Sequence, residues 1–155
     1  MSKVNFGHAF ERWYKLTDAE RKRFDDEQKR GTTPLYLEAL DHLCGLAVES
    51  GMKALMFAAK LEKPDAYGDF PKNPSTGRRP HVDELWDIFI AKASGRKTSA
   101  WVPRLGGRGT TPANVFQTWR AETRYAPDGT ISEGIVRVRL EMAKRLKSIA
   151  EEEGL

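Results

Sequence analysis

The chain has 155 residues, a length that suits one folded domain burying about two-thirds of the surface that its unfolded form exposes. Hydrophobic residues make up 39% and charged residues 31% of the sequence, and the aromatic share of 10% argues against intrinsic disorder. The net charge of +4 is mild, and its distribution along the chain is more informative than its sum.

The chain contains one cysteine, Cys44, which lies among apolar residues. A lone cysteine forms no disulfide within its own chain, so we expect the protein to function in a reducing compartment. The first residues, MSKVNFGHAFERW, contain no apolar signal region, so export by that route is not expected. Both observations lead us to expect a cytoplasmic protein.

Two helices are predicted before residue 32. Residues 4–15 carry aromatic side chains in the pattern of a short amphipathic helix that docks on a core. Thr17 and Glu20 have the spacing of a capping box, in which each side chain satisfies a free backbone N–H at a helix start. This predicts a second, highly charged helix over about 18–30, ended by Gly31.

The most apolar stretch, residues 34–61, is predicted to form the centre of the core. Thr33 followed by Pro34 is typical of a helix start, because threonine caps a free N–H and proline at the first position loses no hydrogen bond. Apolar residues then recur at helical spacing through the whole stretch. The pattern predicts either two helices, about 34–49 and 52–62, or one helix bent at Gly51.

A membrane span is the rival interpretation of this stretch. It contains five charged residues: Glu38, Asp41, Glu49, Lys53 and Lys60. Because each charge costs about 2.5–3.5 kcal/mol at the bilayer centre, we expect no membrane association.

Loops and helices alternate in the second half of the chain. Three prolines within 71–80 predict a loop that packs along the surface, and 81–93 is predicted to be a helix. Residues 95–111 form a long, basic, glycine-rich connection, and loops of this length inside a compact domain are usually functional or disordered. A threonine and a proline then predict another helix over 112–125.

The last predicted helix covers about 131–153. Thr130 and Glu133 form a second capping box before it. A strand over 134–140 is the alternative, since this segment is rich in β-branched residues, but the capping box and the longer apolar period favour a helix. Altogether the sequence predicts an all-α single globular domain over 1–155, with six or seven helices packed around the central apolar helix or helix pair.

Positive charge is concentrated in one part of the chain. Residues 92–124 contain seven Lys or Arg and one acid, a net charge of +6, so the rest of the chain is net −2. Guanidinium groups pair with phosphate in bidentate fashion, and backbone N–H groups of glycine approach phosphate closely. A tryptophan in this region can stack on a base.

This asymmetry predicts nucleic-acid binding, through the basic loop and the helix after it. We therefore expect a small DNA-binding accessory or regulatory protein, with RNA left open as the ligand. The candidate residues are Arg96, Lys97, Trp101, Arg104, Arg108, Asn114, Gln117, Arg120 and Arg124.

A protein-interaction module, an adaptor or inhibitor without nucleic-acid contact, is the alternative. The basic loop is then either a contact for an acidic protein or a solvated surface. The last helix offers an apolar face for a homodimer, made of Ile135, Val138, Met142, Leu146 and Ile149. The same face is equally consistent with ordinary core packing.

The sequence contains no motif that predicts catalysis, a metal site or a cofactor. The three histidines lack the partner spacing of a zinc site. His42 and Cys44 are two residues apart and so lie on different faces of a helix. We therefore do not expect an enzyme.

Overall fold

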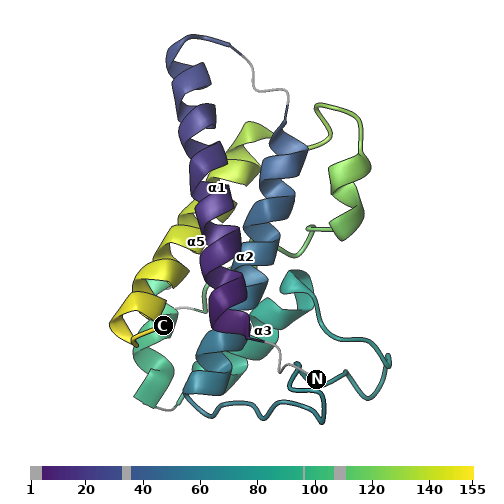
Figure 1. The fold of residues 1–155 in the computed structure, drawn as a ribbon, viewed down its shortest axis with the longest axis vertical. Coiled ribbons are helices and arrows are strands. Elements are labelled where there is room, and N and C mark those ends of the chain that lie inside the picture. Colours follow the sequence, from purple (N-terminus) through teal and green to yellow (C-terminus); the bar gives the residue numbers. More distant parts are fainter. Residues whose placement is uncertain (1–4, 33–35, 96, 107–110) are drawn as a thin grey trace.

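The computed structural model describes residues 5–32, 36–95, 97–106 and 111–155. These ranges contain five α-helices, two short 3₁₀-helices and no strand, which confirms the all-α class. The three longest helices, α1 (Phe6–Lys29), α2 (Leu37–Ala58) and α5 (Glu133–Glu152), lie side by side (Figure 1). Helix α2 contacts both α1 and α5, and it also contacts α3 (Val82–Ala93), so it is the centre of the core as predicted.

Helix α1 joins the two helices that were predicted separately. Asn5 caps its start by accepting a hydrogen bond from the His8 N–H, and the helix then runs unbroken for 24 residues. Thr17 is buried in its middle and donates its hydroxyl proton to the Trp13 carbonyl, so the predicted capping box at Thr17 was wrong. No glycine or proline lies between residues 8 and 29, and a threonine can bond back to the preceding turn inside a helix.

Helix α2 is one continuous helix, so the two-helix alternative was wrong. The chain remains helical through Gly51, because α1 and α5 pack closely there: a Cβ at Gly51 would lie 2.7 Å from Leu146 and 3.0 Å from Phe10. The predicted start at Thr33-Pro34 falls outside the described residues. The described helix begins at Leu37.

The second half of the chain holds the confirmed helices α3 and α5 and one wrong prediction. Ser132 rather than Thr130 caps α5, accepting a bond from the Ile135 N–H. Residues 112–125 do not form the predicted α-helix, because the Asn114 side chain accepts a bond from the Phe116 N–H and closes a local turn. Only the 3₁₀-helix η2 (Ala121–Tyr125) follows.

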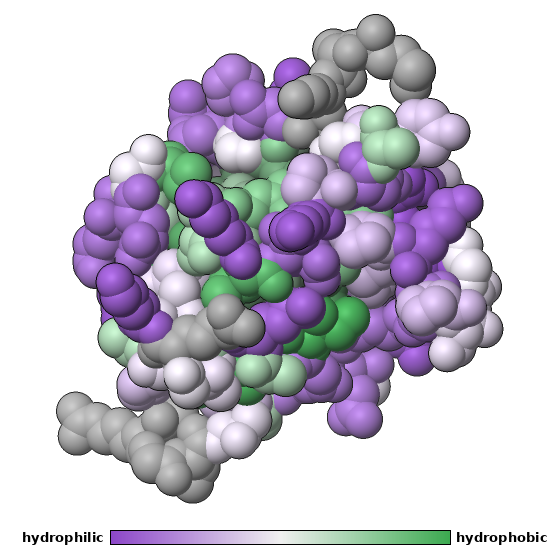
Figure 2. All heavy atoms as spheres, turned by 90° about the horizontal axis from the view of Figure 1, so that it is seen from below, coloured by the Kyte–Doolittle hydropathy of each residue, from purple (hydrophilic) through white to green (hydrophobic). Residues whose placement is uncertain are grey.

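The predicted basic connection over 95–111 contains two short helical segments, the 3₁₀-helix η1 (Lys97–Ala100) and α4 (Trp101–Arg104). Arg96 and 107–110 lie outside the described residues. The end of the molecule seen in Figure 2 is covered largely by hydrophilic residues, with hydrophobic ones between them. No helix in the described ranges is both long and apolar enough to cross a membrane.

Candidate functional site

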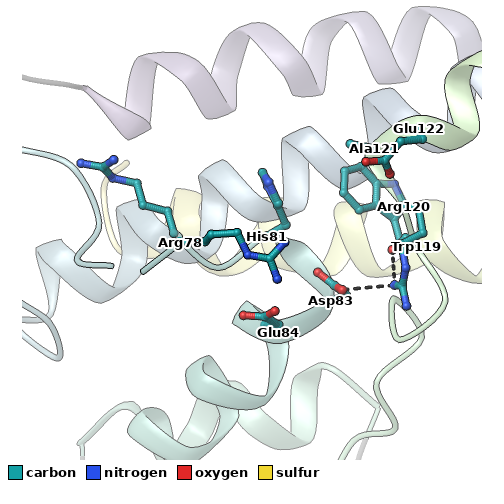
Figure 3. Close-up of a pocket in the computed structure, with 9 residues that line it drawn as sticks. Arg78, His81, Asp83, Glu84, Trp119, Arg120, Ala121 and Glu122 are labelled. Atoms are coloured by element: carbon teal, nitrogen blue, oxygen red, sulfur yellow. Dashed lines mark hydrogen bonds and ion pairs between the residues drawn. The ribbon is translucent and has the colours of Figure 1, made fainter. Parts of the chain in front are cut away.

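A cavity of about 320 Å³ opens between the start of α3 and the segment that leads into η2. We call it the His81 cavity. Figure 3 shows Asp83 and Glu84 on the first turn of α3, and Trp119 and Arg120 on the opposite segment. Its lining residues are Arg78, Arg79, His81, Asp83, Glu84, Trp119, Arg120, Ala121 and Glu122.

One wall of the cavity is held by a charged pair inside α2. Glu49 and Lys53 lie one turn apart and are almost fully buried, with the Lys53 Nζ 2.6 Å from Glu49 Oε1. The other carboxylate oxygen of Glu49 lies 3.2 Å from Nδ1 of His81, the residue that precedes α3. This contact raises the pKa of His81, because Glu49 stabilises the protonated ring. The carboxylate also sets the orientation of the ring, as carboxylates do for histidines in many sites.

The opposite wall is held by the buried guanidinium of Arg139, a residue of α5. Its Nη1 donates to both carboxylate oxygens of Asp41 at 2.8 Å. Its Nε donates to the Val115 carbonyl at 2.9 Å, and its Nη2 donates to the Thr118 hydroxyl at 2.9 Å. The non-helical segment 115–118 is therefore anchored between α2 and α5, which places the following residues, 119–122, at the cavity.

Trp119 forms the floor between the two walls. Its indole lies directly on Gly45 of α2, where a Cβ would come within 2.2 Å of the ring. Its Nε1 donates to the Asp41 carbonyl at 3.2 Å. The His42 ring is stacked on the indole, with 5.8 Å between centroids and 9° between planes. A rigid aromatic layer thus underlies the cavity.

Arg124 extends this layer away from the cavity. Its Nη1 lies 3.2 Å from Nε2 of His42. Burial and then the nearby Arg124 charge lower the pKa of His42, so the ring is neutral and its Nε2 accepts the bond from Arg124. The guanidinium also lies 4.6 Å from the centre of the Tyr125 ring.

The cavity carries both signs of charge. The Arg120 guanidinium is exposed and lies 3.1 Å from the Asp83 carboxylate, and it also donates to the Trp119 carbonyl. Arg78, from the loop before α3, is also exposed and lines the same cavity. Glu84 and Glu122 line the same space, so its field is not uniformly positive. The chemistry available is directional pairing of guanidinium and imidazolium groups with an anion.

The structure divides the residues predicted to bind nucleic acid between two places. Arg120 and Arg124 lie at and beside the His81 cavity, whereas Arg104 pairs with Glu152 at the far end of α5, at 2.6 Å. Lys97 is exposed in η1, close in sequence to Arg104. Arg96 and Arg108 lie outside the described residues.

Three other predicted contact residues have different surroundings. Trp101 is buried, stacked on Phe89, and donates its indole proton to Glu153, so its ring is not presented to a base. Asn114 donates to the Asp83 carbonyl and links the start of α3 to the segment before Trp119. Gln117 is exposed.

The five apolar residues proposed as a dimer face do not share one environment. Met142, Leu146 and Ile149 are buried in the core, whereas Ile135 and Val138 are 43% and 46% exposed. On the first half of α5, the buried residues are instead Val136, Leu140 and Ala143. Only the first two residues of the predicted stripe are therefore exposed to a partner, whereas the other three belong to the core.

Sequence reasoning missed the residues that build the cavity walls. Glu49 and Lys53 are a charged pair at i and i+4 in an otherwise apolar helix, and that contrast was the available signal. Nothing local connects Glu49 with His81, 32 residues away. Arg139 lies within the buried face of the last helix, where a charge needs a partner.

Among the described residues, no group of three or more His, Cys, Asp or Glu side chains is arranged to hold a metal ion. Comparison of the chain with protein-family models, with curated proteins and with solved structures found no match.

Proposed function

We propose that this protein binds nucleic acid, with backbone phosphates held at the His81 cavity. The observation that carries the proposal is the meeting of exposed cationic groups from distant segments at one cavity, Arg78 from the loop before α3 and Arg120 from the segment before η2, with Arg124 four residues further along on His42. Guanidinium groups bind phosphate oxygens through paired N–H donors. Protonated His81 adds one more donor between them.

The pairing of Arg120 with Asp83 is compatible with this role. A guanidinium has five N–H donors, and Arg120 donates to Asp83, Gln117 and Trp119 through its Nη1. Asp83 thus fixes the direction of the side chain and leaves other N–H groups for a phosphate. Arg104 differs, because Glu152 accepts from both of its terminal nitrogens and Ser148 accepts from one of them. A phosphate must displace Glu152 before it can pair with Arg104, so Arg104 and Lys97 form a secondary region for backbone contact.

The proposal is tested by fluorescence anisotropy with labelled duplex DNA, single-stranded DNA and single-stranded RNA at two salt concentrations. We expect salt-dependent binding to at least one of them. Replacing Arg78, Arg120 and Arg124 together by alanine should weaken binding and reduce the salt dependence by about one phosphate contact for each arginine involved.

The matched control replaces three exposed cations on other surfaces, Arg12, Lys15 and Lys144, which changes the net charge equally. A second variant replaces Lys97 and Arg104. If the control variant and the Lys97 and Arg104 variant both weaken binding as much as the cavity variant does, the affinity comes from net charge. The assignment to the cavity is then wrong. If the natural sequence binds none of the three nucleic acids at low salt, the proposed function is wrong.

Interaction with another protein is the second candidate function. Ile135 and Val138 favour it, since these two apolar side chains lie one turn apart on α5 and are both more than two-fifths exposed. Failure of all nucleic-acid titrations would direct attention to this pair.

A further inference from the structure

We propose that Tyr125 is a stacking platform for an unpaired base and that the ligand is single-stranded nucleic acid. This inference rests on the proposed function, and it names the class of ligand and the residue that selects it. Tyr125 replaces the buried Trp101 as the aromatic group available to a base.

The exposure of Tyr125 is the first observation. Its side chain is 76% exposed, although tyrosine rings usually bury much of their apolar surface. It ends the 3₁₀-helix η2, whose first two residues, Ala121 and Glu122, line the His81 cavity. The ring is therefore offered to solvent on the same short segment that borders the proposed phosphate site.

One face of the ring is also covered by a neighbouring side chain, which leaves the other face for a base. The Arg124 guanidinium lies 4.6 Å from its centroid and contacts His42 at the same time. An arginine paired with an aromatic ring combines a stacking surface with a charge for phosphate. Because His42 fixes the guanidinium, this pair is preorganised.

A row of three rings and one guanidinium connects Tyr125 with the cavity. His81 lies 6.4 Å from Trp119, Trp119 lies 5.8 Å from His42, and His42 contacts Arg124 beneath Tyr125. The two interior rings are buried, whereas both ends of the row, His81 and Tyr125, are exposed. The exposed His81 end suits a phosphate, and the exposed Tyr125 end suits a base.

The same geometry favours a single strand over a duplex. A tyrosine can stack on a base only when that base is unpaired and turned outward, as in single-stranded ligands. The α-helix that was predicted over 112–125 is not formed, so this segment offers no helix to enter a major groove. A short 3₁₀-helix ending in an exposed ring takes its place.

The test compares Tyr125→Ala and Tyr125→Phe with the natural sequence, using single-stranded DNA, single-stranded RNA and duplex DNA. We expect Tyr125→Ala to weaken single-strand binding about tenfold without changing the salt dependence, because stacking involves no counterion release. Tyr125→Phe should retain binding, since the ring remains. Duplex binding should be weaker at the outset and unaffected by either change.

Tyr67→Ala is the matched control, because Tyr67 is also a highly exposed tyrosine, at 64%, but lies in the loop before α3. Circular dichroism checks that each variant is folded. If single strands bind and Tyr125→Ala binds as tightly as the natural sequence, the platform is wrong while the proposed function stands. If duplex binds as tightly as single strands, the ligand class is wrong. If nothing binds, the proposed function itself is wrong.

Discussion

At the scale of single residues, two histidines respond in opposite ways to the surfaces around them. The Glu49 carboxylate raises the pKa of His81, whereas burial and Arg124 lower the pKa of His42. Although burial acts to raise it, hydrogen bonds from His81 and Lys53 hold the pKa of Glu49 below its usual range. Glu49 is therefore ionised wherever His81 titrates.

The His81–Glu49 contact predicts a pH dependence of stability. Because the folded pKa of His81 lies above the unfolded value of about 6.5, its stabilisation is fully present below pH 6.5 and is lost as pH rises through the folded pKa. The effect should be less than about 1 kcal/mol, since the His81 side chain is largely exposed.

This prediction is checked by urea unfolding of the natural sequence and His81→Gln between pH 5.5 and 9. The stability advantage of the natural sequence should shrink as pH rises. Comparing the two proteins cancels the contribution of His42, whose charge change has the opposite sign. An advantage that is constant or grows with pH would show that Glu49 does not stabilise protonated His81.

At the scale of elements, α2 depends on glycine to receive its neighbours. Trp119 covers Gly45 so closely that an added Cβ would lie 2.2 Å from the indole. An alanine there improves helix propensity by about 1 kcal/mol, but it must displace a large ring that is bonded to the Asp41 carbonyl. The position of Trp119, and with it the floor of the His81 cavity, therefore requires glycine at this site.

Gly45→Ala should therefore destabilise the protein by a net amount of about 1–3 kcal/mol, the usual range for overpacking. The control is Gly134→Ala in the first turn of α5, where no atom lies near the added Cβ. That change should stabilise slightly, by about 0.5 kcal/mol. Thermal or urea unfolding measures both, and equal effects would mean that Trp119 moves aside without cost.

At the scale of the whole molecule, carboxylates of α2 bind later parts of the chain, both helical and non-helical. Glu38 accepts a bond from the Ile131 N–H, Asp41 binds Arg139, and Glu49 binds His81. Each contact joins α2 to a different later part of the chain. Residues that border the His81 cavity are thus positioned by carboxylates in the most apolar helix. Burying a carboxylate costs free energy unless it is paired, and each of these carboxylates has a partner.

The Asp41–Arg139 pair is predicted to be strongly coupled. Arg139→Met should cost about 3–5 kcal/mol, because it leaves a buried carboxylate without its partner. Adding Asp41→Leu to this variant should recover part of the loss, since neither charge is then left alone. Unfolding measurements on both single variants and the double variant form the thermodynamic cycle, and additive losses would contradict the coupling.

Local patterns were sufficient for the long apolar helices. The helical period over 81–93 and about 131–153 predicted α3 and α5, because each face could be recognised from nearby residues alone. The same period identified α2 as the centre, although not its continuity at Gly51. Helix ends marked by glycine were also predictable, as at Gly31, which adopts the positive φ of 72° that this residue allows.

Predictions from neighbouring residues were wrong where a polar side chain could form either of two local hydrogen bonds. Thr17 could either cap a helix or bond back within one, and only the packing of α1 against α2 selected the second. Asn114 was counted as an exposed helical residue, but it closes a turn and binds the start of α3. The α-helix predicted over 112–125 is therefore not formed.

By itself, the sequence determined the all-α class, the central place of α2 and the excess of positive charge in one region. Only the tertiary structure decided which of those charges lie together, placing Arg120 at the same cavity as Arg78 and His81, and Arg104 beside Glu152. It also buried Trp101 and exposed Tyr125. The physical reason is that helical periodicity is a local property, whereas the surroundings of a charge or a ring are set by contacts between segments tens of residues apart.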